Sequence, residues 1–250
     1  MTGPLALHGG GEFLAGDELF LRAILELAAG MAVERDGPGG IVCVELLTTA
    51  VARHRPEAVY AVGSVAFERV AAERRAGADG PEPPVRVSHA RVVDAASAAD
   101  PVIAEHLAGA DLVYLPGGDP DAVVGILAGT PAWRSVEAAR ARGAVVAGAS
   151  AGAMALGERT WTRDGYVAGF GWAGRLVVMP HATEARLASA RPTVDALPDG
   201  PELAILGLPE RSGVLGGPGA WTVAGAAGAW WWPAQAAAPR HEPDRAVLRG

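Results

Sequence analysis

Residues 143–157, GAVVAGASAGAMALG, carry a single hydroxyl group within a small and apolar stretch. The run before Ser150 is typical of a buried strand, and the run after it is typical of a helix. Gly148, Ser150 and Gly152 fit the pattern G-x-S-x-G, in which a strand turns sharply into a helix and exposes the central serine. The glycines on either side let the two segments pass close together. The stretch therefore predicts a nucleophilic serine at the carboxyl edge of a sheet.

Before this serine, short apolar runs alternate with amphipathic segments. Helices are predicted over 17–30, 56–77 and 98–108, and two short helices lead on to residue 143. Strands are predicted within 5–11, 41–50, 85–93, 111–118 and 143–150. This order predicts an α/β fold, with a mostly parallel sheet flanked by helices on both faces.

The pattern changes after Ser150. We expect a loop over 159–174, strands within 175–182 and 201–210 with a helix between them, and a C-terminal β-hairpin region with glycine turns over 214–232.

No linker divides the sequence, so residues 1–235 are predicted to form a single α/β hydrolytic domain. Residues 236–250 form a Pro-, Ala- and Arg-rich tail that we expect to be only partly ordered. The N-terminal residues lack a basic leader, and no apolar run reaches the roughly 20 residues of a membrane span. We therefore expect a cytoplasmic protein without a membrane partner. The sequence does not determine the oligomeric state, and a homo-oligomer is one alternative.

The composition excludes several kinds of chemistry. A formal net charge of −7 argues against nucleic acid or an anionic membrane as partner, since both require a basic face. The chain contains no lysine, which excludes a Schiff-base lysine and a phosphate-loop lysine. Its single cysteine, Cys43, excludes an internal disulfide and a cysteine-based zinc site, and its apolar surroundings predict a core thiol.

A nucleophilic serine needs a base and a group that orients the base. Among the six histidines, His181 follows the apolar run RLVVMP and would stand at the end of a strand. Glu210 closes another apolar run, LAILGLPE, and its carboxylate could accept the Nδ1 proton of a neighbouring imidazole. Asp164, in the segment TRDGY, is an alternative acid, although an aspartate before glycine is common in turns.

The segment His8–Gly11 matches the HGGG oxyanion loop of α/β-hydrolase esterases, whose serine also lies in G-x-S-x-G. In that fold the loop follows the third strand, whereas here only seven residues precede it. An esterase of that kind would also place its histidine after the acid, which makes His241 its candidate base. We keep it as an alternative.

Four segments in this order resemble the serine peptidases of the dipeptidase E (aspartyl dipeptidase) and cyanophycinase family. They are YLPGGDPDAV, VAGASAGAMALG, VMPHA and PELAILGLPERSGVLGGPG. The resemblance spans roughly residues 5–232. It implies a class I glutamine-amidotransferase-like α/β fold, with a serine in place of the amidotransferase cysteine.

The resemblance also implies roles for individual residues. Ser150 matches the family's nucleophile, His181 its base and Glu210 its acid. The turn Gly117-Gly118, at the end of the predicted strand within 111–118, resembles the family's oxyanion loop. The N–H groups of Gly118 and Ala151 are therefore expected to bind the oxyanion.

The family implies hydrolysis of a small peptide or amide bond, with an Asp-containing dipeptide among the candidate substrates and with no metal or organic cofactor. Candidate substrate-binding residues are Asp119, Arg175, Arg186 and Arg211. Two positions depart from the family's pattern, because Asp119-Pro120 follows the double glycine and Ala182 follows the histidine. A member that binds a ligand without turnover is therefore a second alternative.

Overall fold

The computed structural model describes residues 2–37, 39–78 and 82–249. The helices are α1 (Glu18–Asp36), α2 (Pro56–Gly77), α3 (Ala95–Ala98), α4 (Pro101–Gly109), α5 (Pro120–Leu127), α6 (Pro131–Ala141), α7 (Ala151–Ala155) and α8 (Glu184–Asp195), with short 3₁₀ turns at Thr48–Val51 and Gly200–Glu202. The strands are β1 (Leu5–His8), β2 (Val42–Leu47), β3 (Val85–Ala90), β4 (Leu112–Leu115), β5 (Val145–Ala149), β6 (Arg159–Thr162), β7 (Gly165–Ala168), β8 (Leu176–Pro180), β9 (Ala204–Leu208), β10 (Gly213–Gly217), β11 (Ala220–Ala224), β12 (Ala229–Trp232), β13 (Arg240–Glu242) and β14 (Val247–Arg249).

The larger of the two sheets in the described residues has the strand order β14-β11-β10-β1-β5-β4-β2-β3. The strands from β1 to β3 in this order are all parallel, whereas β10, β11 and β14 run antiparallel to their neighbours. The predicted α/β fold, with a mostly parallel sheet and helices, is confirmed.

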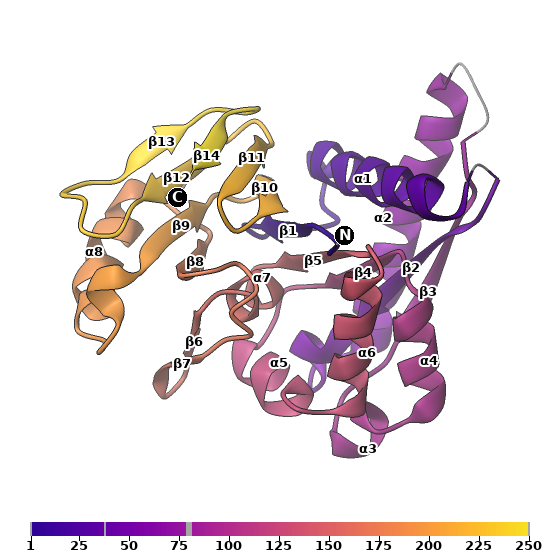
Figure 1. Ribbon diagram of the computed structural model, residues 1–250, viewed down its shortest axis with the longest axis horizontal. Coiled ribbons are helices and arrows are strands. Elements are labelled where there is room, and N and C mark those ends of the chain that lie inside the picture. Colours follow the sequence, from indigo (N-terminus) through magenta and orange to yellow (C-terminus); the bar gives the residue numbers. More distant parts are fainter. Residues whose placement is uncertain (1, 38, 79–81, 250) are drawn as a thin grey trace.

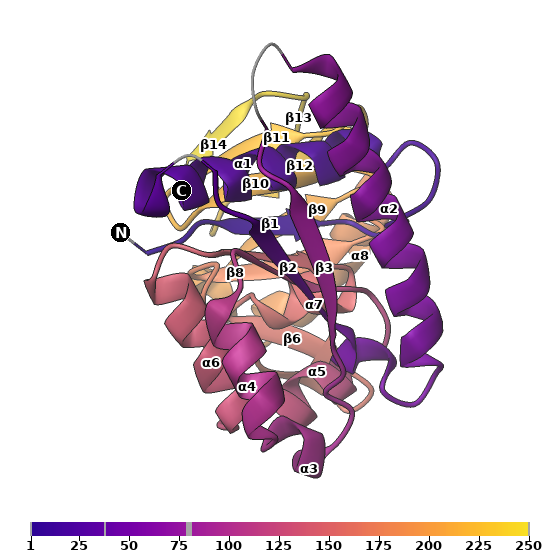
Figure 2. The ribbon, with the colours of Figure 1, turned by 90° about the vertical axis from the view of Figure 1, so that its right-hand side faces the viewer.

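Helices cover both faces of this sheet (Figures 1 and 2). Alternate residues of each central strand point to opposite faces. In β4, Leu112 and Tyr114 pack with α1 and α2, whereas Val113 and Leu115 pack with α3 to α6. Both sets are buried, which explains why these strands read as continuous apolar runs rather than as alternating ones.

A second, six-stranded sheet has the order β13-β12-β9-β8-β6-β7 and carries α8 (Figure 1). Strands β8 and β9 lie side by side and parallel, with Pro180 opposite Leu208, so their carboxyl ends meet at one edge. The expectation of a loop over 159–174 is wrong for its first half, because β6 and β7 form an antiparallel hairpin. The dipeptide Asp164-Gly165, flanked by Trp161 and Tyr166, is the sequence signal for this hairpin, whose two turn residues are Arg163 and Asp164.

The C-terminal residues take part in both sheets. Strand β13 pairs with β12, and β14 pairs with β11. The tail thus contributes two short edge strands where partial order was expected, and the division into 1–235 and 236–250 stays a prediction.

The expectation for Cys43 is wrong. Cys43 lies in β2 but is only half-buried, with its sulfur 3.1 Å from the guanidinium of Arg86, so it is not a core thiol. Trp231 and Trp232 are buried, and Trp172 stacks on Trp133. None of the helices in the described ranges is long and apolar enough to cross a bilayer.

Candidate active site

Ser150 lies in a strained turn between β5 and α7. Its φ of 46° and ψ of −108° are unusual for any residue other than glycine. A Cβ atom at Gly148 would lie 2.5 Å from the carbonyl carbon of Gly152, and one at Gly152 would lie 2.3 Å from the carbonyl oxygen of Leu115. The two glycines are therefore required for the close passage of strand and helix, as the sequence pattern predicts.

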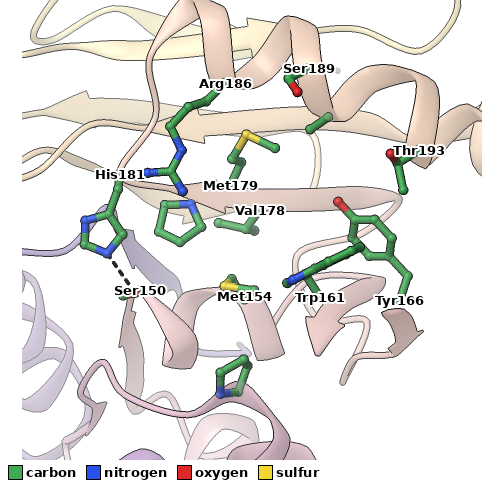
Figure 3. A pocket seen from close by; sticks show the side chains of 13 residues that line it. Ser150, Met154, Trp161, Tyr166, Val178, Met179, His181, Arg186, Ser189 and Thr193 are labelled. Atoms are coloured by element: carbon green, nitrogen blue, oxygen red, sulfur yellow. Dashed lines mark hydrogen bonds between the residues drawn. The ribbon is translucent and has the colours of Figure 1, made fainter. Parts of the chain in front are cut away.

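His181 and Glu210 follow the adjacent parallel strands β8 and β9. The Oγ atom of Ser150 lies 3.1 Å from Nε2 of His181 (Figure 3), and Nδ1 of the same ring lies 3.0 Å from Oε1 of Glu210. With Nδ1–H donating to the carboxylate, Nε2 is free to accept the serine proton. The structure thus brings together the three residues that the sequence singled out.

The pair of His181 and Glu210 is partly open to solvent, with side-chain exposures of 37% and 56%. Solvent at these values screens the charge of the carboxylate, so its electrostatic support of an imidazolium is smaller than in a buried triad. The hydrogen bond still fixes the tautomer and the orientation of the ring.

The glycine loop after β1 joins the two sheets at this site. The N–H of Ser150 donates to the carbonyl of His8 (2.9 Å), and the N–H of His181 donates to the carbonyl of Gly9 (2.8 Å). A Cβ atom at Gly10 would lie 2.3 Å from Cε1 of His181, so only glycine leaves room for the imidazole. Sequence reasoning treated this segment only as a possible esterase loop and missed its role as a support for the histidine.

The buried side chains of His8 and Asp17 contact the same loop. The N–H of Gly10 donates to Nδ1 of His8 (3.4 Å), and Nε2 of His8 lies 3.0 Å from Oδ1 of Asp17. The side chains of His8 and Asp17 are at most 1% exposed.

The glycine turn after β4 lies beside Ser150. A Cβ atom at Gly117 would lie 3.1 Å from Cβ of Ser150, and Gly118 has a φ of 148°. The N–H of Gly117 donates to Oε1 of Glu12 at 2.6 Å. Among the described residues, the N–H groups of Gly118 and Ala151 have no acceptor, and the latter starts a helix, where none is available within the helix itself.

The four candidate substrate-binding residues are dispersed. Arg186 lines the cavity at Ser150, whereas Arg175 pairs with Glu202 (2.7 Å) at the opposite end of β8. Asp119 caps α5 by accepting from the N–H of Asp121 (3.0 Å).

The side chain of Arg211 lies near Gly11 and Gly16, in the loop between β1 and α1, and does not line the cavity. The alternative acid, Asp164, lies exposed in the turn between β6 and β7, whereas Glu210 holds the imidazole. His241, the base that an esterase would require, lies on β13, where its Nε2 is 2.9 Å from the carbonyl oxygen of Ala227. The geometry therefore does not support the esterase alternative.

A cavity of about 470 Å³ opens next to Ser150 and His181 (Figure 3). Its lining is mostly apolar, and among the described residues that line it there is no carboxylate. The remaining lining residues are Pro120, Met154, Trp161, Tyr166, Val178, Met179, Pro180, Arg186, Ser189, Ala190 and Thr193. Burial raises the pKa of Tyr166, so its phenol is neutral at physiological pH. The described residues contain no group of three or more His, Cys, Asp or Glu side chains placed to hold a metal ion.

The family model of peptidase family S51 matches residues 85–170, which include the glycine turn and Ser150. The match confirms, over these residues, the resemblance of the chain to peptidase family S51. This match agrees with the serine-type peptidase that the sequence resemblance implied. His181 and Glu210 lie beyond the matched range, so their roles rest on the geometry above.

Two solved peptidase structures share the fold of this chain along nearly its whole length. The crystal structure of a peptidase from an acI-B1 actinobacterium is 24% identical, with a TM-score of 0.77, and the match covers 100% of this chain and 98% of that one. A putative peptidase E from Listeria monocytogenes EGD-e is 12% identical, with a TM-score of 0.52 and coverage of 96% and 99%. A search of curated proteins gave no match.

Proposed function

We propose that this S51 peptidase hydrolyses a small peptide or amide bond through an acyl-enzyme on Ser150. The observation that carries the proposal is the chain of contacts from Ser150 Oγ to His181 Nε2 (3.1 Å) and from His181 Nδ1 to Glu210 Oε1 (3.0 Å). A hydroxyl, an imidazole and a carboxylate in this order form an activated nucleophile.

In the first step, Nε2 of His181 takes the proton of Ser150 while Oγ attacks the scissile carbonyl carbon. The oxyanion that forms accepts hydrogen bonds from the N–H groups of Gly118 and Ala151. His181 then gives its proton to the leaving nitrogen, the carbon–nitrogen bond breaks, and an ester on Ser150 remains. In the second step, water loses a proton to His181 and attacks this ester, which releases the acid and restores the serine.

Glu210 acts mainly by orienting the imidazole. Its exposure limits its electrostatic contribution, so we expect Glu210→Gln to lower kcat about 10-fold, well below the roughly 10⁴-fold loss known for a buried triad carboxylate. His181→Ala removes the base and is expected to lower kcat at least about 100-fold.

The substrate class follows from the cavity. Its volume of about 470 Å³ suits a ligand of dipeptide size, and Arg186 offers a cation for a carboxylate. An Asp-containing dipeptide is one such substrate. The other candidate residues, Asp119, Arg175 and Arg211, have structural contacts outside the cavity and are not assigned to the substrate.

The test is hydrolysis of a panel of dipeptides and amino-acid amides by the wild-type chain and by Ser150→Ala, His181→Ala and Glu210→Gln. We expect activity in the wild type, none above background in Ser150→Ala, and the graded losses given above in the other two. Arg175→Gln is a matched control that alters a cation outside the cavity. Full activity of Ser150→Ala would contradict the proposal.

A further inference from the structure

We propose that the substrate ends in an amino acid with a large apolar or aromatic side chain, whose α-carboxylate binds Arg186 and whose side chain packs against Trp161 and Tyr166. The inference rests on the proposed function, because it takes Ser150 and His181 as the reacting pair. It names the residue that leaves when the peptide bond breaks.

The first observation is the division of the cavity into two ends. Ser150 and His181 stand at one end, and apolar side chains form the other (Figure 3). This apolar wall consists of Met154 from α7, Trp161 from β6, Tyr166 from β7, and Val178 and Met179 from β8. A wall of this kind is suited to an apolar side chain and offers a small acidic side chain no hydrogen-bond partner of opposite charge.

The second observation is the exposure of Trp161. This indole is 48% exposed although it borders a cavity, and it packs edge-on against Tyr166 with ring centroids 5.1 Å apart. The two residues are directly opposite in the β6–β7 hairpin, which holds them as one unit. A large aromatic surface left open beside a reactive serine indicates a contact with ligand.

The third observation is the position of Arg186 at the start of α8. Its guanidinium lies between His181 and the apolar wall (Figure 3). None of the ion pairs in the described ranges includes Arg186, and no carboxylate lies among the described residues that line the cavity. The cation is thus available for an anion supplied by the substrate, and a guanidinium binds a carboxylate through two parallel hydrogen bonds.

The chemistry of the reaction then fixes which substrate residue is bound there. His181 must give its proton to the leaving nitrogen, so the leaving residue lies on the histidine side of the scissile bond. In a C-terminal amino acid, the α-carboxylate and the side chain both branch from the carbon attached to that nitrogen. Placing the nitrogen near His181 brings the carboxylate to Arg186 and directs the side chain toward Trp161 and Tyr166.

A substrate could instead place an aspartyl side chain, from the residue before the scissile bond, in the cavity. This arrangement uses fewer of the cavity's side chains. The aspartyl carboxylate could also reach Arg186, but it would leave the apolar wall without a ligand contact. The cavity therefore favours selection by the leaving residue.

The experiment compares four dipeptides, Asp-Phe, Asp-Ala, Ala-Phe and Ala-Ala, together with the C-terminal amide of each phenylalanine peptide. We expect kcat/KM to be at least about 10-fold higher for phenylalanine than for alanine at the second position, whichever residue comes first. The amides are expected to be poorer substrates than the free acids by a similar factor.

Two variants assign these preferences to residues. Trp161→Ala is expected to bring the phenylalanine-to-alanine ratio of kcat/KM close to 1, whereas Val167→Ala, its control in the same hairpin, keeps the wild-type ratio. Arg186→Gln is expected to abolish the preference for the free acid over the amide. Its control is Arg163→Gln, a cation in the hairpin turn that does not line the cavity.

The inference is overturned if alanine is preferred to phenylalanine with both first residues, if Trp161→Ala keeps the wild-type ratio, or if amides and acids are cleaved equally. Labelling of wild-type Ser150 by a fluorophosphonate distinguishes a failure of this inference from a failure of the proposed function. A labelled protein that cleaves none of the phenylalanine dipeptides overturns this inference alone, whereas an unlabelled protein that cleaves nothing overturns the proposed function itself.

Discussion

Replacing Gly10 by alanine places a methyl group against the imidazole of His181. The added carbon would lie 2.3 Å from Cε1 and 2.8 Å from Nε2, whereas an ordinary carbon contact begins near 3.4 Å. The ring therefore has to retreat by about 1 Å. Its hydrogen bond with Ser150 is already 3.1 Å long, so the same displacement breaks it.

A misplacement of about 1 Å at a reacting group costs on the order of 100-fold in rate. We expect Gly10→Ala to slow labelling of Ser150 by a fluorophosphonate about 100-fold. The cost in stability is smaller, about 1–2 kcal/mol, because it comes from a side chain in a backbone with φ of 111°. Labelling rates and urea unfolding measure the two effects separately.

Gly11→Ala is the matched control. Gly11 also has a positive φ, 75°, but a Cβ atom there would meet its nearest neighbours, on Arg211 and Glu210, only at 3.5 Å. It should lose a similar amount of stability and label at nearly the wild-type rate. Equal labelling rates for Gly10→Ala and the wild type would refute the steric argument.

Three further predictions concern the surroundings of the site and the core. Glu12→Ala leaves the N–H of Gly117 without its 2.6 Å acceptor, so the labelling rate should fall about 10-fold, and an unchanged rate would show that the glycine turn needs no such anchor. Gly152→Ala should destabilise the protein by at least about 2 kcal/mol in urea unfolding, because its Cβ atom would lie 2.3 Å from the carbonyl oxygen of Leu115; a stable variant contradicts this. Burial raises the pKa of Glu45, so the folded state holds its proton more tightly than the unfolded state, and stability falls as pH rises through the raised value. Glu45→Gln should therefore be about 1 kcal/mol more stable than the wild type at pH 8, a gain that disappears below about pH 4, and a gain that is independent of pH would contradict it.

The sequence was sufficient for features that depend on local sterics or periodicity. The elbow at Ser150 is one, because the need for Gly148 and Gly152 arises within a few residues of the serine. The alternation of apolar runs and amphipathic segments likewise predicts the parallel strands and their helices. The ends of β8 and β9 indicated His181 and Glu210, since parallel strands bring their carboxyl ends to one edge.

Features that depend on strand pairing between distant segments could not be predicted in this way. Arg175 and Arg186 lie at similar distances from His181 in the sequence, yet only Arg186 lines the cavity. A strand rises about 3.3 Å per residue, so Arg175, six residues before His181 along β8, lies about 20 Å away from it. Arg186 stands on the first turn of α8, which follows the turn after His181, and this turn brings it back over the cavity.

The contact of the loop after β1 with His181 could not be predicted from the sequence either. Gly10 meets His181 because the loop after β1 lies against the end of β8, where the N–H of His181 donates to the carbonyl of Gly9, and no local pattern reveals this neighbourhood. The second sheet likewise depends on pairing between distant segments, of β8 with β9 and of β9 with β12. The hairpin signal Asp164-Gly165 was present in the sequence, and its neighbours Trp161 and Tyr166 now form the cavity wall.

The central claim is that Ser150 is the nucleophile. Treating the wild-type chain with diisopropyl fluorophosphate, digesting it with trypsin and locating the adduct by mass spectrometry tests this directly. The tryptic peptide 143–159 contains one serine and no threonine or tyrosine, so an adduct on it identifies Ser150. We predict a single adduct on this peptide and none in His181→Ala over the same time; an adduct on another peptide, or no adduct on folded wild-type protein, would contradict the account.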